Sequence, residues 1–266
     1  MAKQTNQQTL VVGDLHTKYH IFDKVKELSR NYDKVVFLGD YVDEWNASPE
    51  ASYNLLIGLK DFYEENPHKV TLCIGNHEAS EGFGKGFRAS GYNQLTSNYV
   101  YEIFCKFPSI FKTATVEQGF LITHAGLTKS WAEKYLPDCQ TPEDYAKKLN
   151  QALMGYLDLR PLSDEDEKIF YGLGDVGYYR GGSGLPGPLW ADINELLQDP
   201  LPEIKQIVGH SPINTATHFE SKGTDLYFCD THSVYSSLEP IGDNSLLEII
   251  DGQISKISLD GKKIPW

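Results

Sequence analysis

Residues 34–43 read KVVFLGDYVD, an apolar run that ends abruptly in a Gly-Asp pair. Valine and phenylalanine in a run of this length favour a short buried strand. The same pattern recurs on both sides, as TLVVGD at residues 9–14 and KVTLCIGN at residues 69–76. Residues 20–30 and 49–65 separate these runs and carry apolar side chains at helical spacing. This alternation predicts parallel strands joined by right-handed helical crossovers.

The second half of the chain indicates further strands that are largely antiparallel, so we expect an α/β (α+β) fold with mixed sheets. A hairpin is predicted where Thr113–Val116 and Gly119–His124 flank a short turn. The other predicted elements are a helix at Thr141–Leu157 and strands at Ile204–Val208, Asp225–Cys229, Ser245–Ile250 and Gln253–Ile257. Residues 172–187 are rich in glycine and predict a surface loop that could cover a site.

The amino-acid composition limits the classes of molecule that this protein could bind. The 266 residues include 24 basic and 37 acidic side chains, which gives a formal net charge of −13. This balance argues against an extended nucleic-acid surface, which requires a basic footprint. Bound cations could still make one site locally positive. No stretch approaches the length of about 20 apolar residues that a membrane span needs, so we expect no membrane contact.

The four cysteines, at positions 73, 105, 139 and 229, are widely separated and include no Cys-x-x-Cys pair. This spacing argues against a disulfide framework or a zinc knuckle. Reduced thiols in a cytoplasmic protein are the simpler interpretation.

Polar residues that can bind metals follow the predicted strands directly, where parallel strands gather ligands at their carboxyl ends. In an extended chain Asp14 and His16 point to one face and make half of a divalent-metal site. Asp40 follows the neighbouring strand and could bridge two metals. Three later residues could complete the ligands of the second metal: Asn76, His124 and His210.

His77 has a different predicted role. Adjacent residues of an extended chain point in opposite directions, so a His77 next to a metal-facing Asn76 need not be a ligand. It could instead stand over the site and protonate a leaving oxygen. Asp43 is then the residue expected to hold the His77 ring in one tautomer.

Taken in order, these segments resemble the calcineurin-like metallophosphoesterase superfamily, and within it the serine/threonine phosphoprotein phosphatase branch. Short loops favour its bacterial or phage type. The matching segments are GDLHT (13–17), GDYVDEW (39–45), GNHE (75–78), HAGL (124–127) and GHSP (209–212). The resemblance implies a four-layer fold, with central mixed sheets flanked by helices and a dinuclear metal site at the carboxyl ends of the strands. Because the motifs must converge on one site, we expect one domain over residues 1–266.

The resemblance also implies a division of roles. Asp14, His16 and Asp40 would bind one metal, and Asp40 would share the second metal with the three later ligands given above. A hydroxide bridging the metals would attack phosphorus, with His77 as general acid and Asp43 supporting it. Manganese is the preferred metal, and iron, zinc or nickel are alternatives. The expected reaction is hydrolysis of phosphomonoesters, including phosphoserine or phosphothreonine in proteins.

Two positions depart from the family pattern. Glu44 stands where the branch has an arginine that grips phosphate, and Trp45 replaces the glycine after it. A carboxylate there would repel a phosphate dianion unless it points away from the site or another cation compensates its charge. Arg180, in the glycine-rich loop, is the favoured replacement, and Arg88 is the alternative.

Two other functions remain open. The Glu44 departure favours an enzyme that hydrolyses dinucleoside polyphosphates, such as diadenosine tetraphosphate, so a nucleotide or other small phosphoester could replace a phosphoprotein as substrate. The remaining alternative is a metal-bound scaffold without turnover, against which the complete set of ligands argues.

Overall fold

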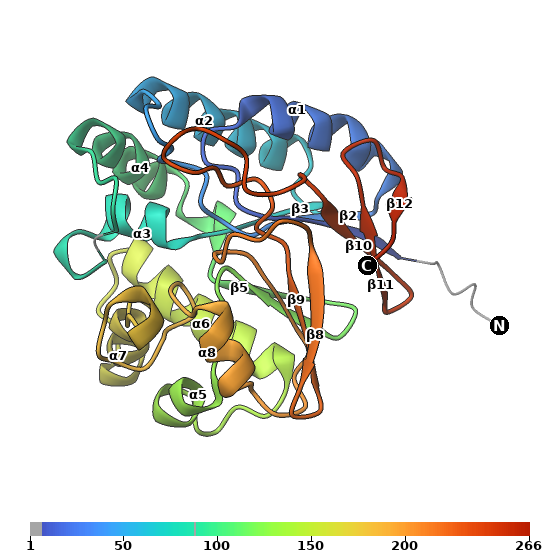
Figure 1. The fold of residues 1–266 in the computed structure, drawn as a ribbon. Helices are drawn as coiled ribbons and strands as arrows, with labels where there is room; N and C mark the ends of the chain where they lie inside the picture. Colours follow the sequence, from blue (N-terminus) through green and yellow to red (C-terminus); the bar gives the residue numbers. More distant parts are fainter. Residues whose placement is uncertain (1–6, 88) are drawn as a thin grey trace.

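The computed structural model describes residues 7–87 and 89–266. Two mixed β-sheets lie against each other in the middle of the molecule, and helices cover both outer faces (Figure 1). This arrangement agrees with the predicted layers of mixed sheets flanked by helices.

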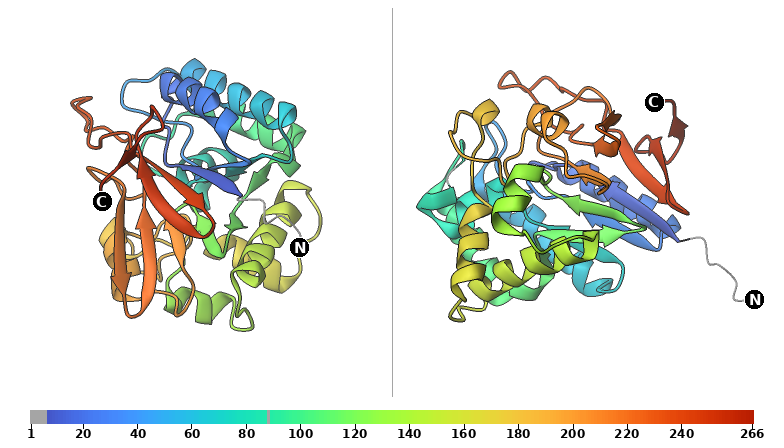
Figure 2. Two further views of the ribbon diagram at one scale, coloured as in Figure 1. Left: turned by 90° about the vertical axis from the view of Figure 1, so that its right-hand side faces the viewer. Right: turned by 90° about the horizontal axis from the view of Figure 1, so that it is seen from below.

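The first sheet, in the described residues, has seven strands in the order β12-β11-β10-β1-β2-β3-β4. Its strands β1 to β4 are parallel, and β10 runs antiparallel to β1. The C-terminal strands therefore extend the sheet that the N-terminal strands begin (Figure 2). The strand bounds are β1 (Gln8–Val12), β2 (Lys34–Phe37), β3 (Val70–Cys73), β4 (Phe111–Lys112), β10 (Leu246–Ile250), β11 (Gln253–Ile257) and β12 (Lys263–Ile264).

The second sheet has the strand order β5-β6-β7-β9-β8. The predicted hairpin forms its edge, because β5 pairs antiparallel with β6. Strands β6, β7 and β9 are parallel to one another, and β8 runs antiparallel to β9. The bounds are β5 (Ala114–Glu117), β6 (Phe120–Thr123), β7 (Gln206–Val208), β8 (Thr217–Ser221) and β9 (Thr224–Phe228).

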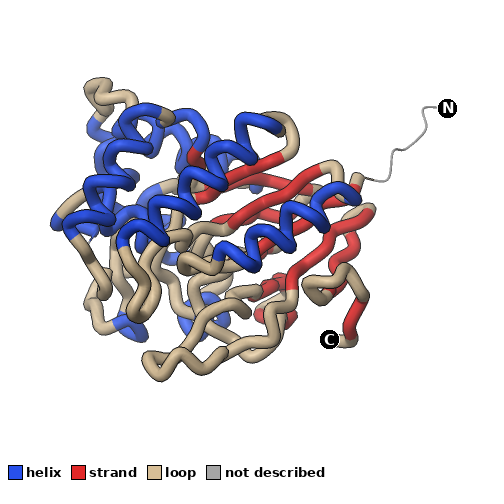
Figure 3. Tube along the Cα trace, turned by 90° about the horizontal axis from the view of Figure 1, so that it is seen from above, coloured by secondary structure: helices blue, strands red, loops and turns tan. Residues whose placement is uncertain are grey.

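Helices α1 and α2 lie across the outer face of the first sheet (Figure 3), and α5 to α8 lie on the side of the second sheet (Figure 1). The helix bounds are α1 (Tyr19–Leu28), α2 (Pro49–Glu65), α3 (Asn76–Phe83), α4 (Gln94–Lys106), α5 (Lys129–Tyr135), α6 (Pro142–Leu157), α7 (Asp164–Gly172) and α8 (Ile193–Gln198). Short 3₁₀ turns cover Ser29–Asn31, Lys85–Phe87, Pro108–Ile110 and Tyr178–Arg180.

Local sequence explains where the long helices begin. Ser48 caps α2 by accepting a hydrogen bond from the Ala51 N–H at 3.3 Å, and Pro49 occupies the first helical position. Thr141 caps α6 in the same way and accepts from the Asp144 N–H at 3.2 Å. The predicted starts of both helices are therefore confirmed.

Side chains along β1 and β2 point alternately to the two faces of the first sheet, and this alternation determines which part of the core each side chain enters. Val11 and Val36 face the second sheet and pack with Ile122 and other apolar residues between the sheets. Their neighbours Leu10 and Val35 point the other way, into the cluster that includes the apolar faces of α1 and α2. Both strands are thus buried on two sides, which explains their nearly continuous apolar sequences.

The chain after β3 differs from the expected extended backbone. Asn76 and His77 are the first two residues of α3, so the argument that adjacent side chains alternate does not apply to them. The chain after β1 also turns early, because His16 and Thr17 have left-handed φ angles of 39° and 60°. Asp14 and His16 consequently do not lie on one extended segment.

Two further observations concern the sequence predictions. All four cysteines are free thiols. Within the described part of the chain, no helix is long and apolar enough to cross a membrane.

Candidate active site

The carboxyl ends of β1, β2, β3, β6 and β7 meet at one edge of the two sheets and bring the predicted polar residues together. In the described chain, two groups of ligand-capable side chains have their donor atoms within 4.8 Å of one another. The first consists of His16, Asp40 and His77, and the second consists of Asp40, His124 and His210. Asp40 belongs to both groups, as expected of a bridging ligand.

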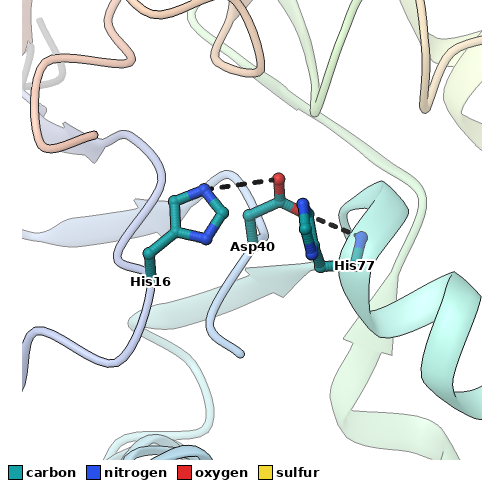
Figure 4. A group of neighbouring side chains, drawn as sticks. All are labelled: His16, Asp40 and His77. Carbon is teal, nitrogen blue, oxygen red and sulfur yellow. Dashed lines mark hydrogen bonds and ion pairs between the residues drawn. The ribbon is translucent and has the colours of Figure 1, made fainter. Parts of the chain in front are cut away.

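The first group is held by contacts to Asp40 (Figure 4). His16 Nε2 lies 3.8 Å from Asp40 Oδ2, and the His77 backbone N–H donates to Asp40 Oδ1 at 3.0 Å. The His16 and His77 rings meet edge to face, with their centroids 5.1 Å apart. His77 therefore lies close to two of the predicted metal ligands, His16 and Asp40. The sequence alone did not indicate this proximity.

The second group is fully buried. His124 Nε2 lies 2.9 Å from Asn76 Oδ1, 3.2 Å from His210 Nδ1 and 3.5 Å from Asp40 Oδ2. Asn76 thus joins this group through its side-chain oxygen, at the start of α3. Four of the predicted ligands converge here: Asp40, Asn76, His124 and His210.

Backbone carbonyls orient two of the imidazole rings. His16 Nδ1 lies 2.7 Å from the Asp43 carbonyl oxygen, and His124 Nδ1 lies 3.1 Å from that of Leu38. A carbonyl can only accept, so both Nδ1 atoms must carry the proton. In the neutral form of each ring, Nε2 is then the nitrogen without a proton and faces Asp40, and this is the tautomer that a metal ligand requires.

Asp14 is buried but belongs to neither group among the described residues. Its carboxylate instead accepts a hydrogen bond from the His210 backbone N–H at 3.0 Å. Gly209 allows this approach, because a Cβ atom at that position would lie 2.1 Å from Asp14 Oδ1. The contact joins the loop after β1 to the loop after β7.

Glu78 holds the loops after β2 and β3 together, a role that was not predicted from the sequence. Its buried carboxylate accepts hydrogen bonds from the N–H groups of Gly75, Asp40, Tyr41 and Val42, at 2.6–3.1 Å. Burial, with a contribution from Asp40, raises the Glu78 pKa to about 7. The final residue of the Gly-Asn-His-Glu motif thus fixes the backbone on which Asp40 sits.

Several site residues occupy the left-handed region of φ, which non-glycine residues rarely adopt. The φ angles are 39° at His16, 51° at Asp40, 58° at Asp43 and 62° at His210. Such conformations cost free energy and persist where surrounding contacts enforce them, often at functional sites. Here they turn the chain sharply after the strands and aim side chains at the shared edge.

His77 and Asp43 form the predicted pair. His77 Nδ1 lies 3.1 Å from Asp43 Oδ2. Burial lowers the pKa of His77, but the carboxylates of Asp40 and Asp43 outweigh burial and raise it to about 9. At this pKa the imidazole carries a proton on both ring nitrogens at neutral pH.

The donor set fits divalent metal ions. Asp14, Asp40 and Asp230 are buried close enough for their charges to interact, and burial followed by this repulsion raises the Asp14 pKa. Burying several carboxylates is costly unless cations compensate their charge. His210 Nε2 is also buried, and no described residue provides it with a hydrogen-bond partner. Asp230, which also lines the cavity over the site, is not among the residues predicted from the sequence.

A cavity with a volume of about 530 Å³ opens over the two groups. His16, Asp40 and His77 line this cavity, together with Trp45 and Arg180. This volume exceeds that of a phosphate group, so part of a leaving group also fits.

Arg180 reaches the cavity from the glycine-rich loop. Its Nη2 donates to the His210 carbonyl oxygen at 3.2 Å and to Ser211 Oγ at 3.1 Å, and its Nε lies 3.0 Å from Asp192 Oδ2. The structure thus places this guanidinium beside the second group. Arg88, the alternative cation, lies outside the described residues.

Comparison with known proteins identifies the family. Residues 8–236 match the calcineurin-like phosphoesterase family, and the chain belongs to it. This agrees with the resemblance inferred from the five motifs.

The curated relatives are serine/threonine-protein phosphatases. A probable phosphatase of Encephalitozoon cuniculi is 32% identical over 138 residues, which are 48% of this chain and 28% of that protein. The phosphatase SIT4 of Candida albicans is 33% identical over 129 residues, or 44% of this chain and 39% of that protein. The matches thus span well under half the length of these relatives.

Solved structures share the fold over nearly the whole chain. A cold-active protein-tyrosine phosphatase of a psychrophilic Shewanella species has a TM-score of 0.62 and 15% identity, with 97% of this chain and 80% of that chain covered. A serine/threonine phosphatase of Saccharomyces cerevisiae has a TM-score of 0.52 and 16% identity, with coverage of 97% and 81%. Identities this low support the common fold alone.

Proposed function

We propose that this chain is a metal-dependent phosphatase that hydrolyses phosphomonoesters, with phosphoserine or phosphothreonine in proteins as the preferred substrate class. The observation that carries the proposal is the position of Asp40, which is shared by two ligand groups beside the His77–Asp43 pair. The family match and the serine/threonine phosphatase relatives support the same class of reaction.

Two metal ions are proposed, with manganese preferred and iron, zinc or nickel as alternatives. His16 and Asp40, with Asp14 nearby, would hold one ion, and Asp40 would share the other with the three remaining ligands of the buried group: Asn76, His124 and His210. When bound, such ions supply Lewis-acid stabilisation of the phosphate and a water of lowered pKa.

The protein residues perform the remaining tasks. His77 would donate the proton that its ring carries to the leaving-group oxygen, and Asp43 would hold the ring by accepting from Nδ1–H. Arg180 would bind phosphate oxygens from the cavity wall, where guanidinium groups pair well with phosphate.

A substrate panel tests the proposal. The purified chain, loaded with manganese, would be assayed with p-nitrophenyl phosphate, phosphoserine and phosphothreonine peptides, and diadenosine tetraphosphate. Turnover of the peptides above the nucleotide is expected. Preference for diadenosine tetraphosphate would overturn the substrate class, and metal binding without turnover of any compound would show a scaffold.

A further inference from the structure

Trp45 is an exposed aromatic residue that lines the cavity over the candidate site. Its exposed fraction is 54%, although an indole ring is among the side chains that gain most from burial. Its side chain forms no hydrogen bond and no ring contact with another described residue. A large apolar surface left open inside a cavity is typical of a residue that contacts a ligand.

A short turn fixes the backbone of Trp45. Residues 44–47 form a β-turn in which the Ala47 N–H donates to the Glu44 carbonyl oxygen at 3.0 Å. The Trp45 N–H donates to Glu44 Oε1 at 2.9 Å, and Asn46 has a left-handed φ angle of 62°, which asparagine tolerates in turns. Helix α2 begins two residues after this turn. The backbone position of Trp45 is therefore set without a ligand.

The cavity wall that contains Trp45 adjoins the proposed general acid. Asp43 precedes Trp45 by two residues, and its Oδ2 lies 3.1 Å from His77 Nδ1. The Asp43 backbone N–H donates to Ser52 Oγ at 3.4 Å, and a Cβ atom at Gly91 would lie 3.6 Å from Asp43 Cβ. Ser52 and Gly91 both line the cavity. Because a general acid protonates the leaving oxygen, the leaving group must lie along this wall.

The same wall carries no charge. None of the described residues that line the cavity within positions 45–52 and 90–96 has a charged side chain. Glu44, next to Trp45, is paired with Lys18. A dinucleoside polyphosphate would place further phosphates against this wall, where no described cation of the wall compensates them. An apolar group would instead cover the exposed indole ring and leave water at no electrostatic cost.

We propose that Trp45 is a specificity-determining residue that contacts an apolar side chain next to the phosphorylated serine or threonine of a peptide substrate. This inference rests on the proposed phosphatase function. Serine and threonine side chains are short, so the residues beside them must enter the part of the cavity that the phosphate leaves free. The cavity volume of about 530 Å³ provides room for such a side chain. Contact with the indole ring would then remove apolar surface of both partners from water.

A set of phosphoserine peptides tests this contact through kcat/KM. The peptides differ only beside phosphoserine, with phenylalanine before it, phenylalanine after it, or glycine on both sides. We expect the wild type to prefer one phenylalanine peptide over the glycine peptide by about fivefold, the order that an aromatic pair contributes. Trp45→Ala should abolish this preference, and Trp45→Phe should retain most of it. The absence of a preference in the wild type, or the same preference in Trp45→Ala, would overturn the inference.

Trp266→Ala is the matched control, because Trp266 has a similar exposed fraction of 56% and does not line the cavity. This variant should keep the preference of the wild type. A merely structural role of Trp45 would lower kcat/KM for all three peptides by the same factor and would overturn the inference. A loss in Trp45→Ala that is confined to diadenosine tetraphosphate would assign the wall to a nucleobase and overturn it as well.

A binding measurement separates this inference from the proposed function. In a His77→Asn background, which should slow hydrolysis, fluorescence anisotropy gives the affinity of the manganese-loaded chain for each labelled peptide. A phenylalanine peptide should bind about fivefold more tightly than the glycine peptide, and Trp45→Ala should remove the difference. This result for a chain that turns over no phosphomonoester would overturn the proposed function alone. Turnover of the peptides with affinities that do not depend on Trp45 would overturn the Trp45 inference alone.

Discussion

Lys18 and Glu44 form an ion pair at the rim of the candidate site, where the two side chains are only 13% and 14% exposed. Glu44 is the residue that stands where the family resemblance predicts an arginine. Its carboxylate lines the cavity, so an unpaired charge would oppose a phosphate dianion. The ammonium group of Lys18 neutralises it, which reduces the conflict between Glu44 and a phosphate substrate.

Substitution Lys18→Met should leave the Glu44 carboxylate unpaired and weaken phosphate binding. We expect KM for p-nitrophenyl phosphate, and the inhibition constant of inorganic phosphate, to rise about fivefold at low salt, because charges near a surface interact through a moderate dielectric. The effect should shrink as salt is added. Steady-state kinetics at two salt concentrations measure both constants.

The matched controls for this change are Lys24→Met and the double variant Lys18→Met with Glu44→Gln. Lys24 pairs with Glu27 on the exposed face of α1, so its loss should leave KM unchanged. The double variant should recover wild-type KM, because no unpaired carboxylate remains. A KM that stays high in the double variant would mean that Lys18 binds phosphate itself.

Arg180→Met should raise KM for phosphomonoesters about tenfold or more, since a hydrogen bond between charged groups contributes about 1.5–3 kcal/mol. Arg160→Met is the matched control. Arg160 is exposed and contacts Asp158 at 2.7 Å, away from the cavity that Arg180 lines. Because Arg180 also contacts His210, metal content must be measured in parallel; an unchanged KM with full metal content would contradict the phosphate role.

Asp40→Asn and His77→Asn should separate metal binding from proton donation. Asp40 belongs to both ligand groups, so the loss of its charge should reduce bound metal and activity together. His77→Asn should keep two metals per chain and lower kcat on alkyl phosphates by about 100-fold or more. Metal analysis after dialysis and single-turnover kinetics measure these quantities, and loss of metal in His77→Asn would assign the ring to the ligands.

The strands and helices between residues 8 and 73 could be predicted because they are strongly patterned, but α4, in the same half of the chain, was not predicted. Strands β1 to β3 are continuous apolar runs, and α2 has a clear N-terminal cap. The eight-residue α3 could not be predicted, because it begins directly after β3 within a motif that contains glycine, asparagine and histidine. Its position depends on the hydrogen bonds of Glu78, which join segments far apart in sequence.

In the candidate site too, the sequence pattern predicted some features, whereas others depend on tertiary contacts. The order of polar residues after strand ends was sufficient to predict that they would meet at one edge. The sequence could not indicate that His77 packs against His16, because this contact needs the left-handed turn at His16 and the start of α3. Pairing of Lys18 with Glu44 likewise joins residues 26 positions apart.

His232 should make stability depend on pH. It is buried, its Nδ1 lies 3.1 Å from Asn244 Oδ1, and its Nε2 has no hydrogen-bond partner in the described chain. Burial lowers its pKa from 6.5 to about 4, despite the opposing contact with Asn244. The folded chain therefore disfavours the proton that the unfolded chain accepts below pH 6.5.

The contribution of neutral His232 is fully present above pH 6.5, declines as the pH falls toward 4, and is constant below that. A difference of this size in pKa corresponds to about 3 kcal/mol of unfolding free energy. We expect His232→Gln to remove this part of the pH dependence, measured by urea unfolding between pH 4 and pH 7. His68→Gln, in the exposed turn before β3, is the control and should behave like the wild type. Parallel curves for His232→Gln and the wild type would show that His232 titrates alike in the folded and unfolded chains.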